Sequence, residues 1–268
     1  MKVFNDLFKL NNGIEIPMIG FGTWQIKEGD EAYKSTLLAL KNGYRHIDTA
    51  AIYGNEKSIG KAIKDSKIPR KDIFVTTKLS PEVKTYEETK IAFDKSLKDL
   101  DLEYIDLYLI HTPWSWNKSG NDCNEGNNAV YRAMEELYLK NKIKAIGISN
   151  FMVKDIKTII ENNSIIPMVN QIRYSIGLNQ SEVIEYCKKN DIFIVAYSPL
   201  DKGHLLKNKY VRKMADKYHV SSSQICLRYL IQKGVGVIPK AVHENYMKEN
   251  LQLNFHLDEK DMIFLDFL

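Results

Sequence analysis

The chain has 268 residues, of which 44% are hydrophobic and 27% are charged, and its formal net charge is +4. This composition is typical of an ordinary globular protein without disordered tracts. The lysines are scattered along the sequence, a pattern that argues against a nucleic-acid-binding surface. No apolar run approaches the ~18 to 20 residues of a membrane span or forms the core of a signal peptide, so we expect a cytoplasmic protein without a membrane partner.

The three cysteines do not form a recognisable pattern. Cys123, Cys187 and Cys226 lie far apart and include no CxxC pair. The sequence therefore predicts neither a disulfide framework nor a metal site, and it favours a reducing compartment.

The first predicted element is a β-hairpin. The segments VFNDLFKL and IEIPM flank Asn-Asn-Gly, a sequence that commonly joins two antiparallel strands. We expect this hairpin to lie across one end of the domain that follows.

Eight β-rich segments then alternate with amphipathic helical segments. In chain order they are IPMIGFGTW, RHIDTA, FVTTKL, DLYLIH, KAIGIS, MVNQIRY, FIVAYSP and VGVIPK. Eight strands alternating with helices over about 250 residues are typical of a (β/α)8 TIM barrel and fit a doubly wound sheet less well. No linker divides the chain, so we expect residues 1–268 to form a single barrel domain.

Capping residues and apolar stripes mark several of the helices. Asp30 is expected to cap a helix that ends before Gly43, and Thr85 with Glu88 forms a capping box. Stripes that should pack on the sheet are Ala32, Leu37, Leu40; Phe93, Leu97, Leu100; Val130, Ala133, Met134, Leu137; and Tyr210, Val211, Met214, Ala215. LDEKDMIFLDFL predicts a terminal helix, and segment 116–128, rich in Asn and Gly, predicts a mobile loop.

Polar side chains stand where most of the predicted strands end. They are Asp48, Lys78, His111, Ser149, Asn150, Gln171, Tyr197, Ser198 and Lys240. Any one of them alone could merely cap a strand or a helix. Because the carboxyl ends of barrel strands build the active site, the whole set predicts one shared cleft in which pKa values are perturbed.

Tyr53 follows Asp48 in the next loop, where Asn55 is placed to cap a helix. A phenol with a pKa of about 10 is a poor proton donor at neutral pH. A nearby ammonium stabilises phenolate, so we expect Lys78 to lower the Tyr53 pKa, while Asp48 keeps Lys78 charged and in place.

The sequence resembles the aldo-keto reductase family in motifs that span nearly the whole chain. They are Gly22-Thr23-Trp24, Asp48, Tyr53-Gly54-Asn55-Glu56, Lys78-Leu79, His111, Gly147-Ile148-Ser149-Asn150-Phe151, Asn170-Gln171, Tyr197-Ser198-Pro199-Leu200, Gln224 to Tyr229 (QICLRY) and Ile238-Pro239-Lys240. This resemblance implies an oxidoreductase that reduces aldehydes or ketones by hydride transfer from NADPH, with NADH as an alternative.

The resemblance also implies a role for each part of the site. Tyr53 would protonate the carbonyl oxygen, with Asp48, Lys78 and His111 completing the catalytic set. Three residues, Ser149, Asn150 and Gln171, would bind the nicotinamide carboxamide, and Tyr197 would stack on its ring. The remaining predicted cofactor-binding residues are Gly22, Thr23, Ser198, Leu200, Lys240, Ala241, Tyr246, Glu249 and Asn250. No Rossmann unit is predicted, because Gly20-Phe21-Gly22 does not complete a GxGxxG fingerprint and is expected to form a tight turn.

One departure from the family pattern bears on the choice of cofactor. Family members often have Ser after Pro-Lys and, six positions after the Lys, an Arg that binds the 2′-phosphate of NADPH. This chain has Ala241 and Tyr246 there. The missing groups would make charge-assisted contacts worth about 1.5 to 3 kcal/mol each. We therefore expect NADPH to be preferred, with compensation from Lys240 and His243, but NADH to be tolerated unusually well.

The substrate side is expected to be lined by Trp24, His111 and Trp114. All three tryptophans, Trp116 above all, could instead be packing residues. Ser80 and Thr112 stand where family members often have tryptophan, which predicts a wider or more polar pocket. Selective family members often carry a longer C-terminal tail than this chain has. We expect a monomer or weak dimer that accepts small or polar carbonyl compounds, such as aldehydes, α-keto aldehydes and keto sugars.

Two other functions are compatible with these residues. A barrel lysine such as Lys78 can form a Schiff base in aldolase chemistry, although Asp48 and Tyr53 beside it favour a reductase. The barrel could instead bind pyridine nucleotide as a regulatory or scaffolding module, which the intact catalytic set argues against. The sequence also leaves open whether His111 orients the carbonyl as a neutral imidazole or shares in proton transfer.

Overall fold

Eight parallel strands form the centre of the molecule in a computed structural model that describes residues 4–118, 123–178 and 180–268. The strands lie in sequence order around one sheet: β3 (Phe21–Gly22), β4 (His46–Asp48), β5 (Phe74–Leu79), β6 (Ile105–Ile110), β7 (Ile143–Ser149), β8 (Val169–Arg173), β9 (Phe193–Tyr197) and β10 (Gly236–Val237). A parallel bridge between Ile19 and Val237 joins the two edges. Each predicted β-segment contains one strand, and the predicted (β/α)8 barrel is confirmed.

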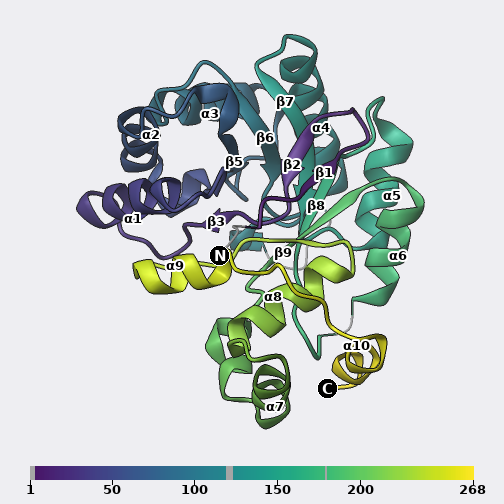
Figure 1. Ribbon diagram of the computed structural model, residues 1–268. Coiled ribbons are helices and arrows are strands. Elements are labelled where there is room, and N and C mark those ends of the chain that lie inside the picture. Colours follow the sequence, from purple (N-terminus) through teal and green to yellow (C-terminus); the bar gives the residue numbers. More distant parts are fainter. Residues whose placement is uncertain (1–3, 119–122, 179) are drawn as a thin grey trace.

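Helices surround the strands, as Figure 1 shows. They are α1 (Asp30–Lys41), α2 (Glu56–Asp65), α3 (Tyr86–Asp99), α4 (Asn124–Leu139), α5 (Val153–Asn162), α6 (Ser181–Lys189), α7 (Lys209–Tyr218), α8 (Ser222–Gln232), α9 (Glu244–Asn250) and α10 (Glu259–Asp266). Thr85 caps α3 as predicted, because its side chain accepts a hydrogen bond from the Glu88 N–H. None of the helices within the described ranges is long and apolar enough to cross a membrane.

Three local predictions about loops and caps are wrong. Asp30 is the first residue of α1, and Gly29 occupies the cap position. Asn55 precedes α2, but its side chain makes no capping hydrogen bond there. Part of the expected mobile loop is helical, because α4 begins at Asn124, while residues 119–122 lie outside the described residues.

Gly20 and Gly22 serve strand packing and do not form the predicted tight turn. A Cβ atom on Gly22 would lie 2.6 Å from the carbonyl oxygen of Ile238, and one on Gly20 would lie 2.6 Å from Nδ1 of His46. The missing side chains therefore allow the chain around β3 to approach its neighbours closely enough for the barrel to close.

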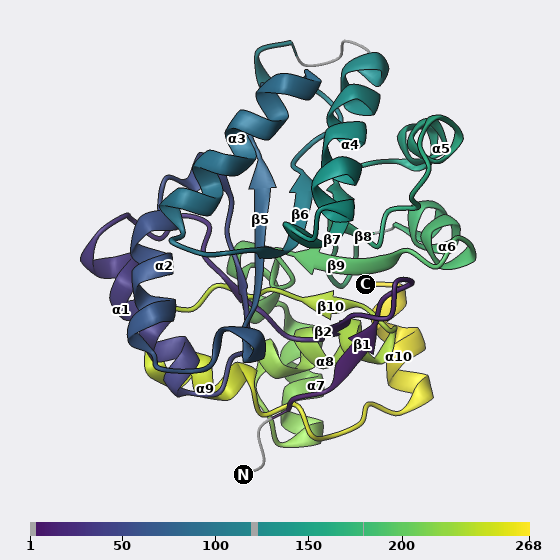
Figure 2. The ribbon, with the colours of Figure 1, turned by 90° about the horizontal axis from the view of Figure 1, so that it is seen from above.

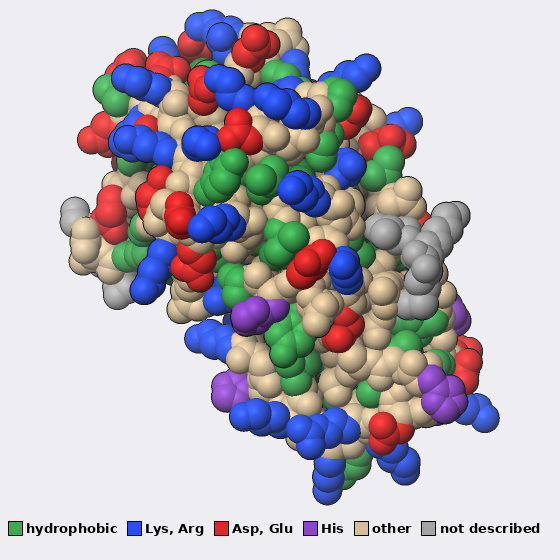
Figure 3. Space-filling model, turned by 60° about the vertical axis from the view of Figure 1, so that its left-hand side comes forward, with side chains coloured by type: hydrophobic (Ala, Val, Ile, Leu, Met, Phe, Trp, Pro, Cys, Tyr) green, Lys and Arg blue, Asp and Glu red, His purple; other side chains and the backbone are tan. Residues whose placement is uncertain are grey.

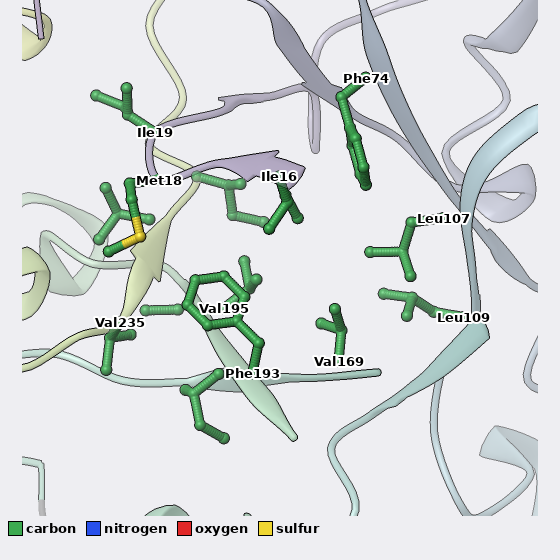
Figure 4. Packing of buried hydrophobic residues seen from close by; sticks show 14 of the residues in the cluster. Ile16, Met18, Ile19, Phe74, Leu107, Leu109, Val169, Phe193, Val195 and Val235 are labelled. Carbon is green, nitrogen blue, oxygen red and sulfur yellow. The ribbon is translucent and has the colours of Figure 1, made fainter. Parts of the chain in front are cut away.

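The predicted hairpin closes the amino-terminal end of the barrel. Its strands, β1 (Leu7–Lys9) and β2 (Glu15–Pro17), are antiparallel, and Phe8 stacks on Phe193 with 4.0 Å between ring centroids. Phe193 is the first residue of β9, so this contact lies at the strand beginnings. Figure 2 shows the hairpin from a second direction, and Figure 4 shows Ile16 among the apolar side chains of the barrel. The carboxyl ends of the strands remain available for a functional site.

We predict that Ile16→Ala weakens the fold and that Leu7→Ala does not. Ile16 has 0% of its surface exposed, and the cavity left by such a truncation typically costs about 2 to 5 kcal/mol. Leu7, on the other strand of the hairpin, is 53% exposed, so its truncation should change stability by less than about 0.5 kcal/mol. Urea unfolding followed by circular dichroism measures both. Equal free energies of unfolding for the two variants would show that the hairpin adds nothing to the core.

Candidate active site

A buried ion pair joins the ends of two neighbouring strands. Asp48 is the last residue of β4, and Lys78 is the last but one of β5. The Lys78 ammonium donates to Asp48 Oδ1 over 2.5 Å and to the Thr49 carbonyl over 2.8 Å. The two charged side chains are only 1% and 2% exposed. Charges removed from water to this extent persist only when they are paired and hydrogen-bonded, and both conditions hold here.

The second oxygen of Asp48 is also bonded. It accepts a hydrogen bond of 2.6 Å from Nε2 of Gln171, which belongs to β8. Asp48 therefore links three strands of the barrel through one carboxylate.

Tyr53 reaches this pair from the loop after β4. It ends a short 3-10 helix, Ala51–Tyr53, and its hydroxyl lies 3.5 Å from the Lys78 ammonium. Gly54 follows with φ 67°, a left-handed conformation that suits glycine. The loop thus turns the phenol toward the ion pair, as the sequence predicted.

Asn55 holds this loop in place, a role that the sequence analysis missed. Its Nδ2 donates to the carbonyls of Thr23 and Ile26, and its Oδ1 accepts from the Thr49 hydroxyl. The side chain is fully buried and joins the loop after β4 to the loop after β3. The sequence signal for this role was an asparagine directly after Tyr53-Gly54. Because Asn55 also stands just before α2, the sequence suggested a helix cap instead.

His111 completes the catalytic group from the end of β6. Its ring lies edge-on to the Tyr53 ring, with centroids 5.8 Å apart. Burial, with a further contribution from the Lys78 charge, lowers the pKa of His111 to about 3. The imidazole is therefore neutral near pH 7. Among the described residues, Nδ1 of His111 has no hydrogen-bond partner.

The prediction that Lys78 brings the Tyr53 pKa below its ordinary value is wrong for this structure. Burial raises the pKa of the phenol and outweighs the lowering by the Lys78 ammonium. Burial also acts to lower the pKa of Lys78, but attraction to Asp48 overcomes this and the pKa is raised. The site therefore combines a protonated phenol with a charged lysine.

The residues predicted to bind nicotinamide form a second group that touches the first. Ser149 Oγ donates to the Gln171 carbonyl over 2.8 Å, and the Tyr197 hydroxyl donates to Asn150 Oδ1 over 2.7 Å. The Asn150 amide also donates to the His111 carbonyl over 3.0 Å. Hydroxyl, amide and aromatic groups from β7, β8 and β9 thus meet beside the catalytic set and suit an amide-bearing ring.

The structure places other predicted cofactor residues in packing or surface positions. Thr23 is buried, and its hydroxyl donates to the Asp48 carbonyl over 2.9 Å. Gly22 lies in the closely packed strand β3. Ser198 has φ 51° in the loop after β9, where Leu200 packs against the core.

The predicted adenosine end lies after β10 and on α9. Lys240 and Tyr246 are exposed there, whereas Ala241 is buried. The Glu249 carboxylate accepts hydrogen bonds from Ser221 and Ser223, and the buried Asn250 side chain bonds the Tyr44 phenol, which comes from the segment before β4. The last two side chains are therefore already engaged within the protein.

The three tryptophans follow the carboxyl ends of strands: Trp24 and Trp114 lie in loops, and Trp116 begins a short 3-10 helix, Trp116–Lys118. Trp24 and Trp114 are 46% and 37% exposed. Trp116 is 51% exposed, and its ring lies 5.7 Å from that of His111. Thr112 does not make the pocket more polar through its hydroxyl, which donates to the Trp114 carbonyl.

On the face drawn in Figure 3, basic and acidic side chains are interspersed over the upper half. Within the described ranges, no three His, Cys, Asp or Glu side chains come together as a metal would require.

The comparisons with known proteins agree with this geometry. Residues 18–266 match the model of the Aldo/keto reductase family. The chain belongs to this family. It is therefore an enzyme of a family of NAD(P)H-dependent carbonyl reductases.

Named relatives extend over nearly the whole chain. A glyoxal reductase of Bacillus subtilis (strain 168) is 43% identical over 98% of this chain and 92% of its own length. The crystal structure of an aldo/keto reductase from Brucella melitensis superposes with a TM-score of 0.92, at 41% identity and 98% coverage of both chains. A Bombyx mori aldo-keto reductase in complex with NADP gives a TM-score of 0.89, at 31% identity over 99% of this chain and 93% of that one.

We predict that the folded protein keeps His111 neutral well below pH 6. The pKa of about 3 lies below the ordinary 6.5, so the unfolded chain binds more protons between these values. The stabilisation is therefore complete above about pH 6.5 and declines, by up to about 1.4 kcal/mol per pH unit, as the pH falls toward 3.

Proton NMR measures this directly, with the His111 ring signal assigned by its loss in His111→Gln. The signal should not move between pH 8 and pH 5, and His111→Gln should lose less stability than the wild type over that range. A titration of the His111 signal near pH 6.5 would contradict the prediction.

Proposed function

We propose that residues 1–268 act as a single barrel domain that reduces aldehydes or ketones to alcohols, with NADPH as cofactor and Tyr53 as proton donor. The observation that carries the proposal is the Tyr53 hydroxyl at 3.5 Å from a buried, charged Lys78 and edge-on to a neutral His111. A proton donor, a cation and a neutral imidazole around one point suit a carbonyl oxygen that gains negative charge during reduction.

Each catalytic residue has a distinct task in this proposal. Tyr53 gives its proton to the carbonyl oxygen, and the Lys78 ammonium stabilises the phenolate that remains. Asp48 holds Lys78 in position. His111, being neutral, orients the carbonyl oxygen by a hydrogen bond and does not supply the proton. Of the two roles that the sequence left open for His111, this assignment favours orientation of the carbonyl over a share in proton transfer.

The chain's own residues suit the binding of a nicotinamide. When bound, this group supplies the hydride. We assign Ser149, Asn150 and Gln171 to its carboxamide because their polar groups meet at the ends of β7 and β8. Tyr197 presents an aromatic ring beside them, fixed through its bond to Asn150. Holding the ring in one orientation is how these residues would contribute to rate.

We infer that the substrates are small carbonyl compounds, with α-keto aldehydes as first candidates. Support comes from the partly exposed Trp24 and Trp114, which lie in loops after β3 and β6, and from a glyoxal reductase as a 43% identical relative. The described cysteines are all free thiols, which suits the reducing conditions of the cytoplasm.

An aldolase mechanism through Lys78 is less favoured. A Schiff base requires a neutral amine that can reach its substrate. The Lys78 amine is 1% exposed, its pKa is raised through Asp48, and it donates to Asp48 and Thr49. Borohydride treatment with a carbonyl compound should therefore leave Lys78 unmodified. A purely nucleotide-binding scaffold would have no need of this catalytic arrangement.

We predict that Tyr53→Phe lowers turnover by at least about 10²- to 10⁴-fold, as expected for loss of a general acid. The ring and its contact with His111 remain, so binding of NADPH should change little. Turnover is followed by NADPH absorbance with methylglyoxal as substrate, and binding by quenching of protein fluorescence. Wild-type turnover in the variant would reject Tyr53 as proton donor, and absence of turnover in the wild type with a panel of aldehydes would favour the scaffold.

We predict a modest preference for NADPH over NADH, below about a thousandfold in kcat/KM. Two charge-assisted contacts of about 1.5 to 3 kcal/mol each would together add a factor of roughly 10² to 10⁴ to this ratio. Here Ala241 is buried and Tyr246, 58% exposed, carries no charge, so Lys240 and His243 are left to contact the 2′-phosphate. Tyr246→Arg should raise the ratio. A wild-type preference above a thousandfold would contradict this reading.

A further inference from the structure

Two residues of the loop between β5 and α3 hold the loop after β6. Glu82 Oε1 accepts from the backbone N–H groups of Trp116 and Asn117 over 2.9 and 3.2 Å, and Oε2 accepts from the Ser115 hydroxyl over 2.5 Å. One carboxylate therefore fixes three consecutive residues. Hydrogen bonds to an ionised acceptor are stronger than neutral ones, and these bonds lower the pKa of Glu82, with the Ser115 contact contributing most.

Lys84 fixes the beginning of the same loop. Its ammonium donates to the Thr112 carbonyl and to Asn127 Oδ1, both over 2.9 Å. Asn127 in turn donates to the Pro113 carbonyl over 2.7 Å. We call Glu82 and Lys84 together the loop clamp.

The first turn of α4 is shaped to fit this clamp. A Cβ atom on Gly126 would lie 2.9 Å from both Cβ and the carbonyl oxygen of Lys84. The glycine thus allows α4 to begin directly against the loop clamp. Figure 2 shows the result at a larger scale, with α3 and α4 side by side.

The clamped segment presents Trp116 to the catalytic group. The Trp116 ring lies 5.7 Å from the His111 ring at an interplanar angle of 60°, and 51% of the residue remains exposed. His111 itself lies edge-on to Tyr53. The Trp116 ring therefore contacts the catalytic histidine while about half of the residue is left for a ligand.

We infer that Trp116 forms a wall of the substrate site and that Glu82 and Lys84 are positioning residues for it. The inference rests on the proposed carbonyl reduction and adds a substrate class to it. The His111 ring contacts both side chains, with its centroid 5.8 Å from that of Tyr53 and 5.7 Å from that of Trp116. An aromatic carbonyl compound can span such a distance and place its ring against Trp116 while its oxygen meets Tyr53. A two- or three-carbon carbonyl compound is too short to do both. The loop clamp therefore sets the discrimination between aromatic and small carbonyl compounds. Proton transfer itself depends on Tyr53 and the Asp48–Lys78 pair.

The test compares 4-nitrobenzaldehyde with methylglyoxal as substrates under saturating NADPH. In Glu82→Ala the KM for the aromatic aldehyde should rise about 3- to 10-fold, the worth of an aromatic contact. The kcat for the aromatic aldehyde, and both kcat and KM for methylglyoxal, should stay near the wild-type values. Glu82→Gln should restore most of the loss, because its amide oxygen can accept the two backbone N–H groups and its amide nitrogen can donate to Ser115.

Glu135→Ala is the matched control. Glu135 also accepts two consecutive backbone N–H groups, those of Ser164 and Ile165, but in the segment before β8, at the opposite end of the barrel. The Glu135→Ala variant should be less stable, but the ratio of its KM values for 4-nitrobenzaldehyde and methylglyoxal should equal that of the wild type. A double-mutant cycle adds a second criterion: Glu82→Ala should have no further effect once Trp116→Ala has removed the wall.

Fluorescence tests the positioning without turnover. In a Trp24→Phe/Trp114→Phe background, Trp116 is the single tryptophan, and Glu82→Ala should increase its quenching by acrylamide. Unchanged quenching, or equal loss with both aldehydes, overturns the inference. If the wild type reduces neither aldehyde, the proposed function fails, and the quenching experiment still decides whether the loop clamp positions Trp116.

Discussion

The ion pair between Asp48 and Lys78 is the interaction on which the site depends. Removing two charges from water costs several kcal/mol for each ion, and attraction between them offsets this only with good geometry and further hydrogen bonds. Here the Thr49 carbonyl accepts from the ammonium and the Gln171 amide donates to the carboxylate. These partners come from the β4 and β8 ends, so the pair is satisfied only when the sheet has closed. Closing the barrel and assembling the catalytic group are therefore one structural event.

One buried ammonium then sets the protonation of its two neighbours in different ways. At His111, burial and the Lys78 charge both lower the pKa, so the imidazole is held neutral. At Tyr53, burial raises the pKa while Lys78 lowers it, so the two effects oppose each other. Burial alone would leave a phenol too weakly acidic to donate a proton, and Lys78 counteracts this. The same charge thus keeps one group from binding a proton and helps the other to release one.

The sequence predicted what is periodic or local, and it failed where distant loops meet. Eight β-rich segments identified the strands, and because parallel strands end at one rim, their polar last residues located Asp48, Lys78 and His111 together. The role of Asn55 escaped because its partners lie up to 32 residues away in another loop. Glu82 is likewise bonded to residues 33 to 35 positions along the chain. The start of α4 was missed because Asn and Gly usually indicate loops, whereas here Gly126 is required by a tertiary contact.

The Asp48–Lys78 ion pair and the hydrogen bonds of Glu82 differ in how substitution affects them. Removing one partner of a buried ion pair leaves an uncompensated charge and typically costs about 3 to 5 kcal/mol. Glu82 is exposed, so water can replace its hydrogen bonds when the side chain is removed. Substitution of Glu82 therefore alters how Trp116 is presented while the fold and the Asp48–Lys78 pair persist. A site built in this way can acquire new substrates through its loops while the proton-transfer chemistry stays the same.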